Sequence, residues 1–310
     1  MYRLAAYALL LLLFGWTCQP PAGEATLPRV AAGTLQRIEA FASAHVDPRR
    51  VDVWLPEGYD AAQTYDVLYM HDGQMLFDSA TTWNHQEWGV DEVVSGLIAQ
   101  GRIRPCIVVG VWNNGDKRWQ EYFPQKAYDR LPDTTLARIR REAAARQNTS
   151  PPVSDAYLRF LVGELKPYID SAYATNPDPA HTFVAGSSMG GLISMYALCE
   201  YPEVFGGAAC LSTHWVGIYT AVGNPAPAAL LGYLHEHLPD TAMHRQFYFD
   251  YGTATLDSLY PPHQAVADSI MRAAGYGDDL WMTRAFPGEG HTERAWNRRL
   301  DIPLTFLLGR

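Results

Sequence analysis

The sequence is poor in positive charge: 24 Lys and Arg stand against 33 Asp and Glu, a formal net charge of −9. Proteins that bind nucleic acid draw most of their affinity from Lys and Arg, so this balance argues against DNA or RNA as a partner. Cysteine is scarce as well, with 4 in 310 residues. Cys106, Cys199 and Cys210 fall in apolar stretches, which predicts buried thiols and excludes a disulfide framework or a zinc site.

Long apolar runs are also lacking. Residues 4–16 form a run of 13 behind Arg3, too short to span a bilayer, which takes about 20 residues, but typical of a bacterial signal peptide. Cys18 suits a lipoprotein, although the preceding Gly15-Trp16-Thr17 matches the usual small-residue box poorly; cleavage and lipid anchoring stay open. We expect a leader and linker over 1–30 and one domain over 31–310, in an exported protein that is periplasmic, extracellular or membrane-anchored.

The rest of the chain alternates short apolar runs with helical patterns. Repeated β-α alternation predicts an α/β fold with a mostly parallel central sheet, helices on both faces, and ligands bound beyond the carboxyl ends of the strands. The predicted strands are 50–55, 65–70, 106–112, 181–185, 207–211, 246–251 and 281–286. The predicted helices are 87–99, 134–147, 155–171, 192–200, 262–274 and 293–308.

Residues 113–152 fit this alternation least well. The segment carries Trp119, Tyr122, Phe123 and Tyr128, followed by a helix rich in arginine. It could cap a pocket or form a solvated surface excursion, and the pattern favours neither.

The clearest local motif is Gly186-Ser187-Ser188-Met189-Gly190-Gly191, which places Ser188 at the centre of G-x-S-x-G. In a nucleophile elbow the serine sits on a strained turn between a strand and a helix. A predicted strand ends just before this motif and a predicted helix starts just after it. The context therefore indicates a catalytic serine rather than a plain glycine-rich turn.

A serine hydroxyl needs a base, and in enzymes with this elbow an acid and then a histidine follow the serine along the chain. His291 lies in a glycine-flanked loop after the last predicted strand, where it would reach the active edge of the sheet. His214, just after the strand that follows the elbow helix, is its main rival and could instead contact substrate.

The acid should lie between the serine and the histidine. Asp257 falls beyond the end of a predicted strand, whereas Asp250 falls on the strand itself; Asp240 and Asp268 are placed less well. We predict Asp257 as the third catalytic residue, with Asp250 as the alternative.

Four stretches together resemble the putative-esterase family of α/β-hydrolases, which includes enterochelin, feruloyl and acetyl-xylan esterases, S-formylglutathione hydrolases and mycolyltransferases. They are Val67 to Gln74, Gly186 to Gly191, Tyr251-Gly252-Thr253 with Asp257, and Gly290-His291 with Trp296.

The resemblance implies a single α/β-hydrolase domain, a Ser-Asp-His triad and no metal or organic cofactor. It further implies that the backbone N–H groups of Gln74 and Met189 form the oxyanion hole, and that Asp72 contacts a substrate hydroxyl. The expected substrate is a small-molecule or carbohydrate ester. Acyl transfer to a sugar or thiol, and a non-catalytic binding protein of the same fold, remain alternatives.

Overall fold

A computed structural model describes residues 26–309 except 138, 140–150 and 218–222. The predicted leader with Cys18, and most of the helix predicted over 134–147, lie outside the described residues. None of the helices in the described part is both long and apolar enough to cross a membrane.

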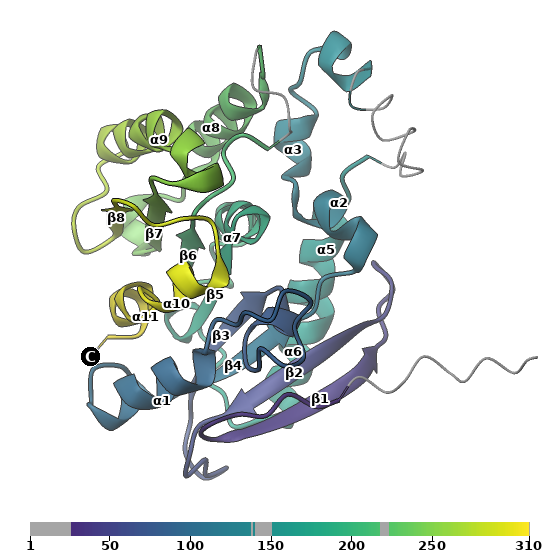
Figure 1. Ribbon diagram of the computed structural model, residues 1–310, viewed down its shortest axis with the longest axis vertical. Helices are drawn as coiled ribbons and strands as arrows, with labels where there is room; N and C mark the ends of the chain where they lie inside the picture. Colours follow the sequence, from purple (N-terminus) through teal and green to yellow (C-terminus); the bar gives the residue numbers. More distant parts are fainter. Residues whose placement is uncertain (1–25, 138, 140–150, 218–222, 310) are drawn as a thin grey trace, which may run out of the picture.

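One sheet of eight strands forms the centre of the molecule, in the order β1-β2-β4-β3-β5-β6-β7-β8 (Figure 1). β1 and β2 are antiparallel to their neighbours, and the other pairings are parallel. The predicted α/β fold with a mostly parallel sheet is confirmed. All seven predicted strands are present, and the edge strand β1 is an addition. The strands are β1 (Thr34–Phe41), β2 (Arg49–Leu55), β3 (Asp66–His71), β4 (Cys106–Val111), β5 (Thr182–Ser187), β6 (Gly207–Leu211), β7 (Gln246–Gly252) and β8 (Trp281–Phe286).

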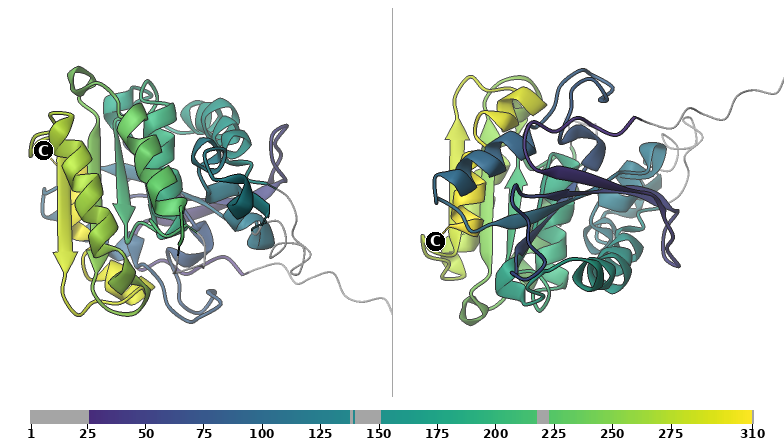
Figure 2. Two further views of the ribbon diagram at one scale, coloured as in Figure 1. Left: turned by 90° about the horizontal axis from the view of Figure 1, so that it is seen from above. Right: turned by 90° about the horizontal axis from the view of Figure 1, so that it is seen from below.

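Helices cover both faces of the sheet, as the two views in Figure 2 show. One face carries α1 (Val90–Ala99), α10 (Glu293–Asn297) and α11 (Asp301–Leu308). The other carries α2 (Arg118–Tyr122), α3 (Gln125–Tyr128), α5 (Ser154–Phe160), α6 (Lys166–Ala172), α7 (Met189–Glu200), α8 (Ala226–His237) and α9 (Pro261–Ala273). Short 3-10 helices lie at η1 (Gly73–Met75), η2 (Gly115–Lys117), η4 (Pro179–His181), η5 (Thr241–Met243) and η6 (Thr255–Leu259), and a π-helical turn, η3 (Leu161–Leu165), joins α5 to α6.

The central strands explain why both faces are covered. In β3, Val67 and Tyr69 pack into the core on one face, while Leu68 and Met70 pack into the core on the other. Every residue of β3, β4, β5 and β6 is buried. A strand that is apolar on both sides must lie between two helical layers. The three cysteines Cys106, Cys199 and Cys210 are buried and unpaired, as predicted.

Three parts differ from the predicted helices. The expected helix over 293–308 is divided into α10 and α11, and that over 155–171 includes the π-helical turn η3. Helices α2, α3 and α8 had no counterpart among the predictions. In the irregular segment, Tyr122, Phe123 and Tyr128 are buried and pack into the main core. These aromatic residues are therefore packed in the core, while residues 115–117 and 132–134 of the same segment are exposed.

Candidate active site

Ser188 stands on a sharp turn between β5 and α7. Its backbone has φ 58° and ψ −120°, and a non-glycine residue in such a conformation costs about 1–3 kcal/mol unless its surroundings impose it. The N–H of Ser188 donates to the carbonyl oxygen of Leu211 at 2.9 Å, and its own carbonyl accepts from the N–H of His214 at 3.2 Å. The end of β6 therefore fixes the strained turn.

Glycines provide the space for this turn. A Cβ added to Gly186 would lie 2.7 Å from the backbone of Gly190, so a side chain there would force the turn apart. From Thr182 to Cys199, a stretch that is described throughout, Ser188 is the one residue that is not buried. The turn thus presents a single serine from an otherwise buried strand and helix.

His291 and Asp257 form a hydrogen-bonded pair. The Nδ1 atom of His291 lies 2.6 Å from Oδ1 of Asp257, with the two side chains 16% and 0% exposed. Asp257 lies in η6, just beyond the carboxyl end of β7, and His291 lies in the loop after β8. The N–H of His291 also donates to Oγ1 of Thr255 at 2.8 Å. This arrangement places a proton on Nδ1 and leaves Nε2 as the basic nitrogen.

Ser212 supports the carboxylate of Asp257 from the other side. Its hydroxyl donates to Oδ2 of Asp257 at 2.6 Å and accepts from Nε1 of Trp296 at 2.9 Å and Nη2 of Arg299 at 2.8 Å. The N–H of Gly252 donates to the same carboxylate oxygen at 2.6 Å. Burial alone would raise the pKa of Asp257, but hydrogen bonds from His291 and Ser212 hold it below its usual range. The carboxylate is therefore ionised and fixed in orientation.

Asp250, the alternative acid, has a different partner. It lies on β7 and is fully buried, where Arg299 contacts both of its carboxylate oxygens, Nη2 at 2.8 Å from Oδ1 and Nε at 3.0 Å from Oδ2. Tyr248 and the N–H of Ser212 donate to it as well. Burial still raises the pKa of Asp250 despite the charge of Arg299. The structure joins Asp257, and not Asp250, to His291.

His214 connects the serine turn to the histidine loop. Its N–H donates to the carbonyl of Ser188, and its Nδ1 lies 2.8 Å from the hydroxyl of Tyr260. The ring of Tyr260 in turn meets the ring of His291 edge to face, with centroids 6.0 Å apart. Burial, followed by the neighbouring His291 and the charge of Arg118, lowers the pKa of His214 to about 3. His214 is a neutral, buried group at this site, which does not suit a general base working near neutral pH.

Gln74 and Met189, the predicted oxyanion donors, both lie in the first turn of a helix: Gln74 is the second residue of η1 and Met189 the first of α7. The first N–H groups of a helix have no partner within it, so they can bind an oxyanion. The two helix starts follow the paired strands β3 and β5. They are also close in space, because a Cβ on Gly190 would lie 3.4 Å from Oδ2 of Asp72.

Asp72, predicted to contact substrate, is already held by protein groups. Arg118 donates to both of its carboxylate oxygens at 2.7 Å, and Nδ2 of Asn113 donates to Oδ1 at 2.7 Å. Burial alone would raise the pKa of Asp72, but the charge and hydrogen bonds of Arg118 keep it below its usual range. Its main contacts are with the segment that follows β4.

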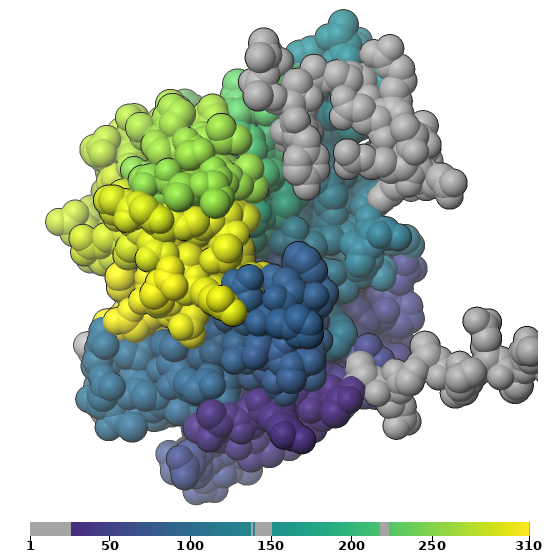
Figure 3. Space-filling view, viewed as in Figure 1, coloured from purple at the N-terminus to yellow at the C-terminus, as the bar shows by residue number. Residues whose placement is uncertain are grey.

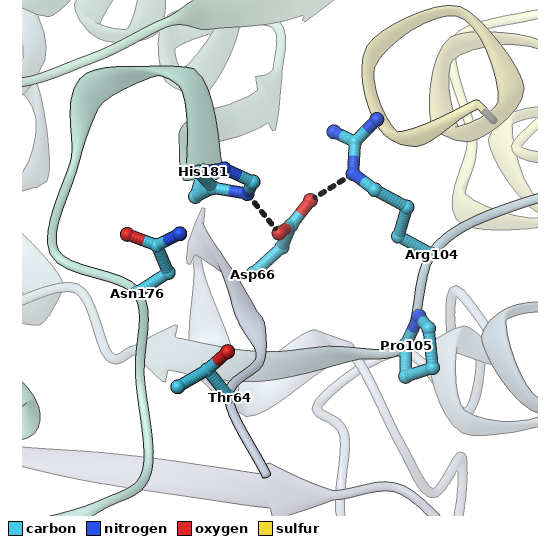
Figure 4. A pocket seen from close by; sticks show the side chains of 6 residues that line it. All are labelled: Thr64, Asp66, Arg104, Pro105, Asn176 and His181. Carbon is cyan, nitrogen blue, oxygen red and sulfur yellow. Dashed lines mark hydrogen bonds and ion pairs between the residues drawn. The ribbon is translucent and has the colours of Figure 1, made fainter.

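A second Asp-His cluster lies at the amino ends of the central strands, around a cavity of about 560 Å³ (Figure 4). There Asp66, the first residue of β3, accepts from Nε of Arg104 at 2.7 Å and contacts Nδ1 of His181 at 2.6 Å. None of the predicted site residues lines it; the lining residues are Thr64, Asp66, Arg104, Pro105, Asn176 and His181.

Sequence reasoning missed three side chains that shape the site: Ser212, Arg299 and Arg118. Ser212 directly follows a predicted strand, and that position is the one signal that could have found it. Arg118 and Arg299 reach Asp72 and Asp250 across 46 and 49 residues of chain, and no local pattern reports such contacts.

Comparison with known proteins places the chain in a family. A family model described as "Putative esterase" matches residues 43–300. An uncharacterized protein of Bacillus subtilis, YbbA, is 24% identical over 172 residues, which cover 54% of this chain and 58% of the relative. An endo-1,4-beta-xylanase/feruloyl esterase of Xylanibacter ruminicola is 27% identical over 180 residues, which cover 56% of this chain and 21% of the relative. The alignments thus span only part of these curated relatives.

Solved structures show the same fold at low sequence identity. A ferulic acid esterase superposes with a TM-score of 0.63 at 19% identity, covering 89% of this chain and 98% of the other. The enterobactin esterase of Shigella flexneri superposes with a TM-score of 0.60 at 18% identity, covering 90% and 60%. The fold is that of the α/β-hydrolases. With a family model matched over most of its length, the chain belongs to the putative esterase family.

Proposed function

We propose that this chain hydrolyses a carboxylic ester through an acyl-serine intermediate. Ser188 is the nucleophile, His291 the general base, and Asp257 the carboxylate that orients the histidine. The backbone N–H groups of Gln74 and Met189 bind the oxyanion. The observation that carries the proposal is the 2.6 Å contact between Nδ1 of His291 and Oδ1 of Asp257, at the sheet edge that holds the strained Ser188 turn.

The proposed reaction has two halves. Oγ of Ser188 attacks the ester carbonyl carbon while Nε2 of His291 takes the hydroxyl proton. The carbonyl oxygen becomes an oxyanion, the carbon–oxygen bond to the alcohol breaks, and His291 returns the proton to the departing alcohol. Water then attacks the acyl carbon and gives a proton to His291. As the second oxyanion collapses, the bond between the acyl carbon and Oγ of Ser188 breaks, His291 returns the proton to Oγ, and the acid is released.

The environment of Asp257 supports its part in both halves. A carboxylate that is ionised and held by Ser212 and Gly252 keeps the imidazole in one tautomer and stabilises the imidazolium that forms during each proton transfer. Each oxyanion donor is worth about 3–4 kcal/mol in comparable enzymes, since it acts on charge that develops only in the transition state.

Labelling with a fluorophosphonate tests the proposal directly. We expect the purified protein to be labelled at Ser188, with simultaneous loss of aryl-ester hydrolysis, and S188A to show neither labelling nor hydrolysis. Ser187, the buried neighbour outside the motif frame, supplies the control: folded S187A should keep both. Labelling at another residue, or full hydrolysis by folded S188A, would refute the assignment.

The substrate class comes from the relatives. A xylanase/feruloyl esterase and an enterobactin esterase resemble this chain, so we propose aryl esters such as feruloyl sugars and catecholate esters as the first substrates to measure. His214 and Asp72 stay predicted substrate contacts. The screen should include acetyl sugars and S-formylglutathione, so that a preference for small acyl groups is also detected.

We further propose that the protein is exported, from the leader seen in the sequence. If Cys18 carries a lipid anchor, C18S moves the protein from the membrane to the soluble fraction, because the acyl chains supply the membrane affinity. An unchanged distribution in fractionated cells would remove the anchor from the proposal.

A further inference from the structure

The loop that carries the proposed oxyanion donor starts from an unusual backbone conformation. Asp72 has φ 59° and ψ 44°, in the left-handed region, and the next residue begins η1. A non-glycine residue keeps this conformation where neighbouring groups impose it. The direction of the Gln74 N–H, two residues further on, depends on it, so the groups that hold Asp72 also control the donor.

Those groups come from residues 113–122, which we call the clamp segment. Arg118 makes a bidentate contact with the Asp72 carboxylate, and Asn113 donates to Oδ1. The hydroxyl of Tyr122 accepts the backbone N–H of Asp72 at 3.3 Å. A bidentate arginine fixes the orientation of a carboxylate as well as its position. The clamp segment thus binds both the side chain and the backbone of Asp72.

The clamp segment is itself anchored to the sheet. Glu121 forms an ion pair with Arg49 of β2 at 2.7 Å, and both side chains are buried. Asn114 donates to Asp47 at 3.0 Å, just before the same strand. Arg118 therefore reaches Asp72 from a fixed base, which a flexible surface loop would not provide.

Asp72 also touches the serine side of the site. A Cβ placed on Gly190, in the first turn of α7, would lie 3.4 Å from Oδ2 of Asp72 and 3.5 Å from the Cβ of His71. The carboxylate thus lies between the guanidinium of Arg118 and the first turn of α7. A shift of Asp72 would change the spacing between η1 and α7, which carry the two proposed donors.

We propose that Arg118 is a positioning residue that sets the spacing of the oxyanion donors Gln74 and Met189 by holding Asp72 against the start of α7. This inference rests on the proposed function, because the donors matter only in an acyl-transfer reaction. Arg118 acts through Asp72 and takes no part in proton transfer.

The test compares Arg118 with a matched arginine elsewhere. R118M removes the bidentate contact, R118K keeps the charge without the fork, and R50M removes an arginine of similar exposure, 32% against 30%, from an ion pair with Glu39. We expect kcat for an aryl ester to fall about 10- to 100-fold in R118M, less than the 10²–10³ of a deleted donor. KM should stay within about twofold, and R118K should lie between wild type and R118M. R50M should match wild type.

A transition-state analogue separates positioning from a general loss of structure. The affinity for an aryl boronic acid, which forms a tetrahedral adduct with the serine, should fall in R118M by the same factor as kcat, while product affinity should not change. The variants D72N and R118M should be strongly non-additive when combined, since both break one contact. Equal losses in R118M and R50M, or a change in KM alone, would overturn the proposal.

Hydrogen exchange gives a readout that needs no turnover. In R118M, amides of residues 72–76 should exchange faster than in wild type, while those of the buried strand β6 keep their rates. Unchanged exchange at 72–76 would overturn the inference even in an active enzyme. If R118M shows this difference from wild type but the wild type hydrolyses no ester, the proposed function is refuted while the role of Arg118 in holding residues 72–76 stands.

Discussion

Two Asp-His pairs lie at opposite ends of the strands of the same sheet, and in both the histidine Nδ1 is 2.6 Å from a carboxylate oxygen. Asp257 and His291 lie beyond the carboxyl ends of β7 and β8, whereas Asp66 and His181 lie at the amino ends of β3 and β5. By distance alone the two pairs cannot be told apart. What surrounds them can distinguish a reacting pair from a structural one.

The difference lies in the carboxylate's other oxygen. At Asp66 it is neutralised by Arg104 at 2.7 Å, and the histidine is 33% exposed. At Asp257 it accepts from Ser212 and Gly252, while the nearest arginine nitrogen is 4.0 Å away. The Asp257 charge is thus left to act mainly on His291, beside the strained serine turn. In parallel sheets ligands bind at the carboxyl ends of the strands, so the surroundings of Asp257 and His291 fit the proposed catalytic role better than those of Asp66 and His181.

Replacing the aspartate of each pair by asparagine should give the largest difference in kcat between the two pairs. D257N should lower kcat by about 10⁴, as in a serine protease, because the amide favours the wrong imidazole tautomer. D66N should leave kcat within about twofold. Rates on one aryl ester, measured with circular dichroism as a folding control, decide this. A larger loss in D66N would reverse the assignment of the two edges.

Asp250 allows a closer comparison, because it lies on β7, the strand that leads into the loop with Asp257. D250N leaves Arg299 buried without its anionic partner, and losing one member of such a pair costs about 3–5 kcal/mol. We expect a large drop in the urea midpoint and a much smaller loss of kcat than in D257N. If folded D250N loses more activity than D257N, then Asp250 is the catalytic acid.

The pH dependence separates His291 from its neighbour. Because the pKa of His214 is lowered to about 3, His214 stays neutral as pH rises from 5 to 8 and contributes no ascending limb to kcat/KM. H214Q should therefore lower activity without moving the pH at which kcat/KM reaches half its plateau. A shifted or lost limb in H214Q, compared with wild type in the same buffers, would show that His214 is the titrating base.

The smallest effect is expected at the amino edge. H181N removes a contact made by a partly exposed histidine, and the buried Asp66 keeps its ion pair with Arg104. Contacts of exposed side chains contribute about 0–1 kcal/mol. The urea midpoint should move only slightly, with no change in kcat. A drop in kcat comparable with that of H291N would show that the cavity of Figure 4 takes part in turnover.

The parallel core of the fold could be predicted because strands buried on both faces are continuous apolar runs. The edge strand β1 does not follow that pattern: Gln36, Arg37 and Glu39 interrupt its apolar residues, and of its eight residues only Leu35 is buried. Helix α8 was missed because its first turn, with Pro225 and Pro227 around Ala226, resembles a loop. Both elements are defined by tertiary contacts and not by local periodicity.

The candidate site divides in the same way. Ser188 has a motif, and His291 and Asp257 have positions relative to strands, so local patterns were enough to propose them. The choice of Asp257 over Asp250 depended on where β7 ends, and the hydrogen bond to His291 supports it. The contacts of Arg118 and Ser212 join segments that only the folded chain brings together, so no spacing in the sequence could predict them.

The hydroxyl of Ser212 has one further consequence. It joins Asp257 to Trp296 of α10 and to Arg299, just before α11, so the last part of the chain supports the acid that orients the histidine. During gentle warming, turnover should be lost when this C-terminal region loosens, before the parallel strands separate. Enzyme activity would then report local unfolding that spectra of the whole protein do not resolve.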